Sequence, residues 1–146
     1  RSRFVAEPAP RRLRLRRPLA ASRPARHRHA MSELEPVEVR APEGARLMEI
    51  DWSDGSTSLL THRVLRAFCP CAGCQGHHGP IAYVPIDGLP DTAFVLADLA
   101  PAGQYALRMS WGDGHSTGIY RFSFLRALGA LYGEADVRER TFSHDT

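Results

Sequence analysis

The chain has 146 residues, of which 43% are hydrophobic, and this length allows at most one folded domain with a modest core. Its formal net charge of +3 and pI of about 9.1 hide an uneven distribution, because residues 1–30 hold ten arginines and one acid, Glu7. Residues 31–146 therefore carry a net charge of −6, so the basic pI does not mark the folded part as a nucleic-acid binder. No apolar run reaches the roughly 18 residues of a membrane helix, and we expect a soluble, cytoplasmic protein.

Residues 1–30 are rich in arginine, proline and alanine, and this composition predicts a disordered leader. Three origins fit it: translation upstream of a true start at Met31, a transit segment, or a basic arm for nucleic acid. The chain lacks lysine and asparagine, which indicates a G+C-rich, bacterial genome. We favour the first origin, because G+C-rich DNA upstream of a true start translates into sequence rich in arginine, proline and alanine. Nucleic-acid binding is the least expected, since Phe4 is the one aromatic residue of the leader. Residues 31–44 are expected to form a flexible linker.

An internal repeat organises residues 45–133. The run Trp52-Ser53-Asp54-Gly55-Ser56-Thr57-Ser58 matches Trp111-Gly112-Asp113-Gly114-His115-Ser116-Thr117 at an offset of 59 residues. In each copy apolar and polar residues alternate before the tryptophan, which predicts a strand with one buried face. Each Asp-Gly pair predicts a two-residue hairpin of type I′, and a short helix with one apolar face follows each hairpin.

The repeat predicts an α+β domain in which two strand–hairpin–helix units build one small antiparallel sheet with two packed helices. In chain order the expected strands cover residues 48–52, 57–60, 94–99, 105–111 and 116–120, and the expected helices cover residues 62–68 and 123–132. Trp52 and Trp111 are expected to pack in the core and not to stack on a ligand. Residues 134–146 are expected to form a flexible tail.

All three cysteines of the chain lie in the run Cys69-Pro70-Cys71-Ala72-Gly73-Cys74. This spacing is too tight for three separate structural roles, and three converging thiolates are typical ligands of a soft metal ion. Pro70 ends the preceding helix, and Gly73 is expected to supply the φ freedom that folds the third thiolate back. Cysteines kept for a metal also fit a reducing cytoplasm. The run therefore predicts a metal site that lacks one ligand.

Four histidines are candidates for the missing ligand: His62, His77, His78 and His115. His77 and His78 are nearest along the chain, but glycines bracket them in a segment that reads as a loop. His115 takes the place of a serine just after the second hairpin, and a duplicated fold commonly brings equivalent elements face to face. We therefore favour His115 over His77 and His78.

These motifs resemble the gamma-butyrobetaine hydroxylase-like N-terminal domain family over roughly residues 45–130. The resemblance rests on Trp52–Leu60, on Leu65-Arg66-x-x-Cys69-Pro70-Cys71-x-x-Cys74, and on Trp111-x-Asp113-Gly114-His115. In the hydroxylases this domain precedes the catalytic domain and binds zinc through three cysteines and one histidine. The resemblance implies that the ligands here are Cys69, Cys71, Cys74 and His115. Similar domains fused to P-loop iron–sulfur carrier proteins imply a link to iron–sulfur assembly.

The expected function is that of a metal-binding accessory or protein-interaction domain in which zinc is structural. The alternative is an iron or iron–sulfur accessory protein in cluster assembly or redox chemistry. A 2-oxoglutarate oxygenase needs a double-stranded β-helix that presents two histidines and a carboxylate to iron, and about 90 folded residues do not supply one. We therefore expect no enzyme activity, and we expect a separate protein or a second copy of the chain as the partner.

Overall fold

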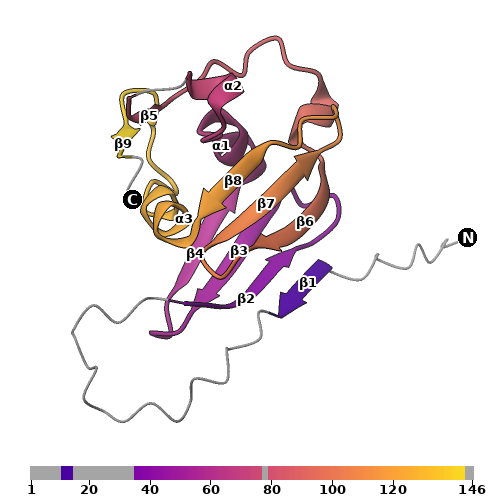
Figure 1. The fold of residues 1–146 in the computed structure, drawn as a ribbon, viewed down its shortest axis with the longest axis vertical. Coiled ribbons are helices and arrows are strands. Elements are labelled where there is room, and N and C mark those ends of the chain that lie inside the picture. The colour runs from indigo at the N-terminus through magenta and orange to yellow at the C-terminus, as the bar shows by residue number, and fades with distance from the viewer. Residues whose placement is uncertain (1–10, 15–34, 77–78, 144–146) are drawn as a thin grey trace, which may run out of the picture.

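The computed structural model describes residues 11–14, 35–76 and 79–143, whose arrangement is shown in Figure 1. One antiparallel sheet contains, in this order, β1 (Arg11–Arg14), β2 (Pro36–Ala41), β3 (Leu47–Trp52) and β4 (Thr57–Thr61). A second antiparallel sheet contains β6 (Leu96–Ala102), β7 (Ala106–Trp111) and β8 (Gly118–Arg121). Two short strands, β5 (Ile81–Ala82) and β9 (Thr141–Phe142), pair with each other. The helices are α1 (His62–Ala67), α2 (Ala72–Gln75) and α3 (Phe122–Gly129), and a 3₁₀ turn, η2, covers Asp91–Phe94.

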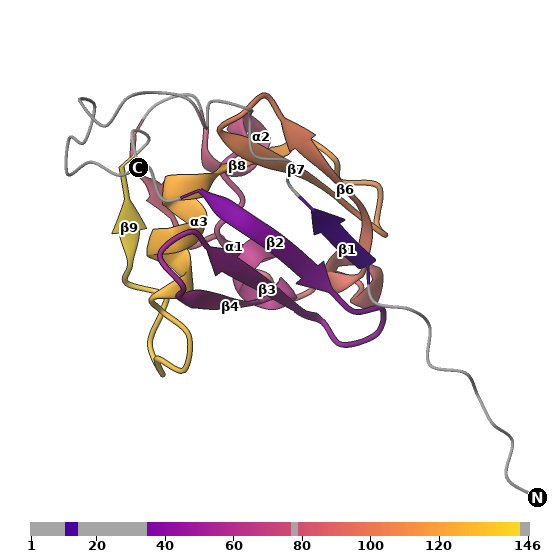
Figure 2. The same cartoon turned by 90° about the horizontal axis from the view of Figure 1, so that it is seen from below.

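The expected α+β class is confirmed, but each repeat unit forms its own sheet instead of sharing one. The reason lies at the ends of β4 and β8, because α1 and α3 each begin at the residue that follows the strand. In both units a helix thus leads the chain away from the sheet edge. Figures 1 and 2 show the two sheets on either side of the core, with α3 beside β4 and β8. No helix among the described residues is long and apolar enough to cross a membrane.

The core is built from the inward faces of both sheets and from α1 and α3. Alternate residues of β3 and β7 are buried, as the period-2 pattern predicts, and Trp52 and Trp111 are each 2% exposed. The Tyr120 hydroxyl, fully buried on β8, donates a hydrogen bond of 2.6 Å to the Leu65 carbonyl oxygen of α1. The two tryptophans are therefore core residues, as expected.

The duplication extends beyond the part that sequence matching reveals. In the first sheet the β2–β3 register shifts between Pro36 and Glu38, where β2 lies opposite Trp52. In the second sheet the β6–β7 register shifts between Leu96 and Asp98, opposite Trp111. Each unit therefore consists of three strands and a helix, with a bulge at the same place.

Both hairpins differ from the expected type I′ turn in the same way. Trp52 N donates to Ser56 O at 2.8 Å, and Trp111 N donates to His115 O at 2.8 Å, so three residues lie in each loop. The glycine of each loop has a positive φ, 87° at Gly55 and 94° at Gly114, whereas the preceding aspartates do not. This is the pattern of a three-residue hairpin loop whose last residue is a left-handed glycine.

Two segments expected to be flexible are ordered where the structure describes them. The expected linker, residues 31–44, contains β2, whose Val39 is fully buried between β1 and β3. The expected tail, residues 134–146, contains β9, and the Phe142 ring lies edge-on to the rings of Phe68 and Phe124 at 5.6 and 5.3 Å. Apolar burial supplied by residues distant in sequence explains both differences. Residues 31–34 and 144–146 lie outside the described residues.

The expected leader is described only at residues 11–14, which form β1 on the edge of β2. Leu13 is paired with Val39 and packs against the core, whereas Arg12 is paired with Arg40 on the outer face. This alternation matches the pleat of a strand, so Arg12 and Leu13 point to opposite faces of the sheet. The proposed start at Met31 and the other leader residues lie outside the described part of the chain.

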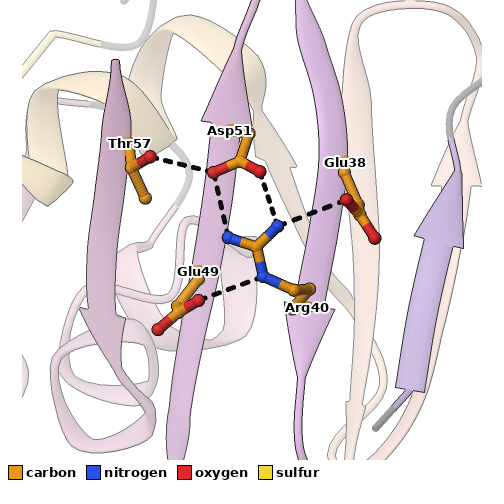
Figure 3. Close-up of polar contacts among 5 residues, drawn as sticks. All are labelled: Glu38, Arg40, Glu49, Asp51 and Thr57. Atoms are coloured by element: carbon orange, nitrogen blue, oxygen red, sulfur yellow. Dashed lines mark hydrogen bonds and ion pairs between the residues drawn. The ribbon is translucent and has the colours of Figure 1, made fainter. Parts of the chain in front are cut away.

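The outer face of the first sheet carries a charge network centred on Arg40 (Figure 3). The guanidinium group donates to Asp51 Oδ1 at 2.9 Å, to Glu49 Oε2 at 3.1 Å and to Glu38 Oε2 at 3.3 Å. Thr57 Oγ1 donates to Asp51 Oδ1 at 2.8 Å. Arg40 and Thr57 together hold the pKa of the Asp51 carboxyl below its usual range. Without Arg40, three carboxylates of adjacent strands would face one another.

Candidate metal centre

The cysteine run follows α1 directly and is held by short local structure. The Thr61 hydroxyl caps α1 by accepting from Val64 N at 3.2 Å, and the helix ends at Ala67, with Phe68 as its C-cap. Cys69 is then fully buried, and Cys71 is the N-cap of the four-residue helix α2. The left-handed residue is Gly76, with φ of 77°, and not Gly73, which lies within α2. The expected role of Gly73 is therefore wrong, because a helical turn folds Cys74 back without it.

Gln75 anchors this loop, and sequence analysis did not identify it. Its amide nitrogen donates to Cys69 O at 3.0 Å and to Ala82 O at 2.9 Å, while its amide oxygen accepts from Ala82 N at 2.9 Å. One side chain thus joins the start of the cysteine run to β5. A glutamine beside a cysteine carries no signal of this role in a single sequence, because its partners are backbone groups.

His115 lies opposite the three thiols, at the end of the β7–β8 hairpin. Its Nε2 atom is 3.3 Å from Cys69 Sγ, 3.5 Å from Cys71 Sγ and 3.7 Å from Cys74 Sγ. All four ligand atoms lie within 4.8 Å of one another. The structure therefore brings together the four residues that the resemblance implied as ligands.

These distances fit a single tetrahedral ion. Zn–S bonds of about 2.3 Å and Zn–N bonds of about 2.05 Å at the tetrahedral angle place a sulfur and a nitrogen ligand about 3.6 Å apart. The three observed Sγ–Nε2 distances of 3.3, 3.5 and 3.7 Å bracket this value. In a polynuclear iron–sulfur cluster the ligands bind different iron atoms, which spreads them more widely. The donor set and its spacing therefore fit one metal ion with four protein ligands.

Without a cation, burial opposes the ionisation of two of the three thiols. Burial raises the pKa of the Cys69 thiol far above its usual range, and burial, followed by the neighbouring Cys71, raises the pKa of Cys74. Burial also acts to raise the pKa of Cys71, but hydrogen bonds from Thr117 and Cys74 outweigh it and lower that pKa. Burial and the nearby Arg66 lower the pKa of His115, which favours the neutral imidazole that a metal requires. A divalent cation would offset the cost of ionising the buried thiols.

An ion pair between the two repeat units holds the His115 hairpin against α1. Arg66 Nη2 of α1 lies 2.6 Å from Asp113 Oδ2, and the two side chains are only 8% and 14% exposed. The other oxygen, Asp113 Oδ1, accepts a hydrogen bond of 3.1 Å from His115 N. Asp113 therefore fixes the backbone that carries the histidine, and Arg66 places a positive charge beside the thiols.

The second unit repeats this ion pair with the roles of the units exchanged. Arg126 Nη2 of α3 lies 3.0 Å from Asp54 Oδ2 in the first hairpin, and Arg126 Nη1 donates to Ser56 Oγ at 2.6 Å. The Arg126 guanidinium also lies over the Trp52 ring, 5.5 Å from its centroid. Each helix thus binds the hairpin of the other unit, and Ser56 stands where the second unit has His115.

Of the other three candidate histidines, the structure describes His62 alone. His62 is buried at the start of α1, its Nδ1 lies 2.9 Å from Phe94 O, and its ring meets Trp111 edge-on at 5.5 Å. Because a carbonyl oxygen only accepts, Nδ1 of His62 carries the proton. His62 therefore belongs to the core and not to the cysteine group. His77 and His78 lie outside the described residues.

Comparisons with known proteins agree with this architecture. The sequence model of the family described as gamma-butyrobetaine hydroxylase-like, N-terminal, matches residues 39–126. A crystal structure of a protein of unknown function from Acidithiobacillus ferrooxidans, assigned to the DUF971 family, is 36% identical, with a TM-score of 0.52. That match covers 66% of this chain and 93% of the other.

Two NMR solution structures are also similar. One is 26% identical with a TM-score of 0.51 and covers 67% of this chain and 74% of its own. The other is 24% identical with a TM-score of 0.55, covers 69% of this chain and 73% of its own, and supports the fold alone. Because the family match spans more than half of the sequence, the chain belongs to the gamma-butyrobetaine hydroxylase-like N-terminal domain family.

Proposed function

We propose that this protein is a metal-binding accessory domain in which one zinc ion, held by Cys69, Cys71, Cys74 and His115, joins the two repeat units. The observation that carries the proposal is the position of His115 Nε2, 3.3–3.7 Å from three thiol sulfurs. The cysteines belong to the first unit and the histidine to the second, so the ion would connect segments some forty residues apart. Zinc with four protein ligands has no open position, and its role would be to stabilise the fold.

The proposed role is binding and not catalysis. The family match covers the N-terminal domain of the hydroxylases, and no oxygenase catalytic domain is evident in the residues of this chain. We propose that the domain acts through a protein partner, either a separate subunit or a second copy. Light scattering at several concentrations, followed by crosslinking in a bacterial lysate, tests this part, and a monomer that captures no protein would contradict it.

The metal assignment is tested by metal analysis and visible spectroscopy of protein purified without oxygen. One zinc per chain and a colourless sample are expected. A brown sample with broad visible absorption would replace zinc by an iron–sulfur cluster, and a stoichiometric content of iron alone would replace it by mononuclear iron.

The ligand assignment is tested by comparing His115→Ala with His77→Ala. We expect His115→Ala to lose the metal and to melt at a much lower temperature, because three thiols then lack their fourth partner. We expect His77→Ala to keep both the metal and the melting temperature. The opposite pattern would refute the ligand set.

A further inference from the structure

A groove of about 280 Å³ lies beside α1, and no cysteine lines it. It is bounded by α1, by the segment after β5 and by the segment that leads to β9. Its apolar wall is formed by six residues: Val64, Ala67, Tyr83, Ile86, Ala135 and Val137. Three charged side chains also line it: Arg63, Arg138 and Asp87.

The two arginines of the groove are held in place without an ion pair. The Arg63 guanidinium lies over the Phe94 ring, 4.7 Å from its centroid, and the Arg138 guanidinium lies 5.7 Å from the Tyr83 centroid. Within the described ranges, neither has a carboxylate at salt-bridge distance. The carboxylate near Arg63, that of Asp91, already accepts two hydrogen bonds of 2.6 Å from Arg46. The stacked guanidinium groups are therefore oriented and have free donors.

We propose that this groove binds a small aliphatic carboxylate. The planar fork of a guanidinium group matches a carboxylate, and the apolar wall matches a hydrocarbon chain. Asp87 leaves the groove with one net positive charge, which a monoanion neutralises, and inorganic phosphate lacks the hydrocarbon chain that the apolar wall would contact. An apolar cavity of about 150 Å³ accepts benzene, so a groove of this volume has room for roughly ten non-hydrogen atoms. The proposal is independent of the metal assignment.

The test is an NMR titration of the full chain with 4-methylpentanoate, with 4-methylpentanamide as the neutral analogue and inorganic phosphate as the dianion. We expect saturable shifts at the amides of Ala67 and Ile86 with the acid, and none with the amide or with phosphate. The double variant Arg63→Gln/Arg138→Gln should weaken binding about tenfold or more, because it removes the charged donors. The matched control, Arg108→Gln on β7, removes an exposed arginine outside the groove and should bind as the native chain does.

Several results would overturn the proposal. Absence of saturable shifts in the native chain up to about 20 mM acid would show that the groove has no useful affinity. Equal binding of the acid and the amide, or of the native chain and the double variant, would show that the arginines do not recognise the charge. Tighter binding of phosphate than of the acid would show a general anion site. The metal content of each sample, measured in parallel, separates these outcomes from failure of the zinc assignment.

Discussion

The ion pair between Arg66 and Asp113 gives the sharpest prediction, because the duplication supplies its own control. Asp113→Asn keeps the side-chain oxygen that accepts from His115 N but removes the charge that faces Arg66. Arg66 is 8% exposed, so the variant leaves a buried guanidinium group without its counter-ion. Breaking one partner of a buried pair costs about 3 kcal/mol. For a domain of this size that loss lowers the melting temperature by about 10 °C.

Metal affinity should fall as well. The ion pair with Arg66 holds the hairpin that carries His115 against α1, and disturbing an outer partner of a metal ligand weakens binding by about tenfold or more. The control is Asp54→Asn, which removes the equivalent aspartate of the first hairpin. Asp54 and Arg126 are 40% and 33% exposed, so water screens that pair and the expected loss of stability is much smaller. Metal affinity should not change in Asp54→Asn.

The assay combines thermal unfolding of the metal-free and metal-loaded forms with zinc competition against a chelator. The variant Asp113→Glu extends the series, since it restores the charge and should recover part of the affinity. Equal losses of stability in Asp113→Asn and Asp54→Asn would refute the argument from burial. Unchanged zinc affinity in Asp113→Asn would show that the aspartate stabilises the fold without positioning the ligand.

Three further predictions concern packing, charge and the sheet edge. Gly129→Ala should destabilise the chain by about 1–3 kcal/mol in thermal unfolding, because its Cβ would lie 2.7 Å from Ser58 Cβ; a neutral result would show that α3 shifts freely. Arg40→Met should lower the free energy of unfolding in urea by about 1 kcal/mol at pH 7. Part of this loss should be recovered near pH 5, because the unpaired carboxylates take up protons, and an equal loss at both pH values would contradict the argument. Leu13→Asp should detach β1, speed amide exchange in β2 and increase self-association through the exposed edge; unchanged exchange would show that β1 does not protect β2.

The pH dependence of the Arg40 network in the native chain has the opposite sign to that of the variant. The pKa of Asp51 is held low by Arg40, so the pair contributes its full stability above the pKa of about 3.9 that an unfolded aspartate has. That contribution is lost as the pH falls from there through the lower pKa of the folded state. The stability of the native chain should therefore fall on acidification, whereas that of Arg40→Met should first rise.

Sequence reasoning reached the four residues of the candidate metal centre because its signals are local and duplicated. The cysteine spacing is visible in six residues, and His115 stands out because the matching position of the first repeat holds Ser56. The tryptophan-ended strands were equally clear, since their alternation records one buried face each. Each of these features can be predicted from a few neighbouring residues or from a direct comparison of the two copies.

Edge elements were missed because distant residues decide them. The run that forms β2 alternates Val37, Glu38 and Val39, yet a bulge after Pro36 leaves Val37 48% exposed and buries Val39. The two residues of β9 are ordered by pairing with β5 and by aromatic contacts of Phe142 with residues that are distant in sequence. Neither the bulge nor the pairing partner is visible in a local pattern, so both segments read as flexible.

The sequence contains the residues by which the helix of each unit contacts the hairpin of the other unit, but this pairing could not be recognised without the structure. Each copy carries a Leu-Arg pair after its hairpin, and the arginines are Arg66 and Arg126. Their aspartate partners, Asp113 and Asp54, lie in the opposite unit, so the repeated arginine is a mark of contact between units and not of contact within one. At the positions equivalent to the cysteines the second copy has Gly129, Leu131 and Glu134, which cannot supply thiolates. The Cys₃His group is therefore an addition to one of two equivalent ion pairs, and the other pair shows the same contact without such a group.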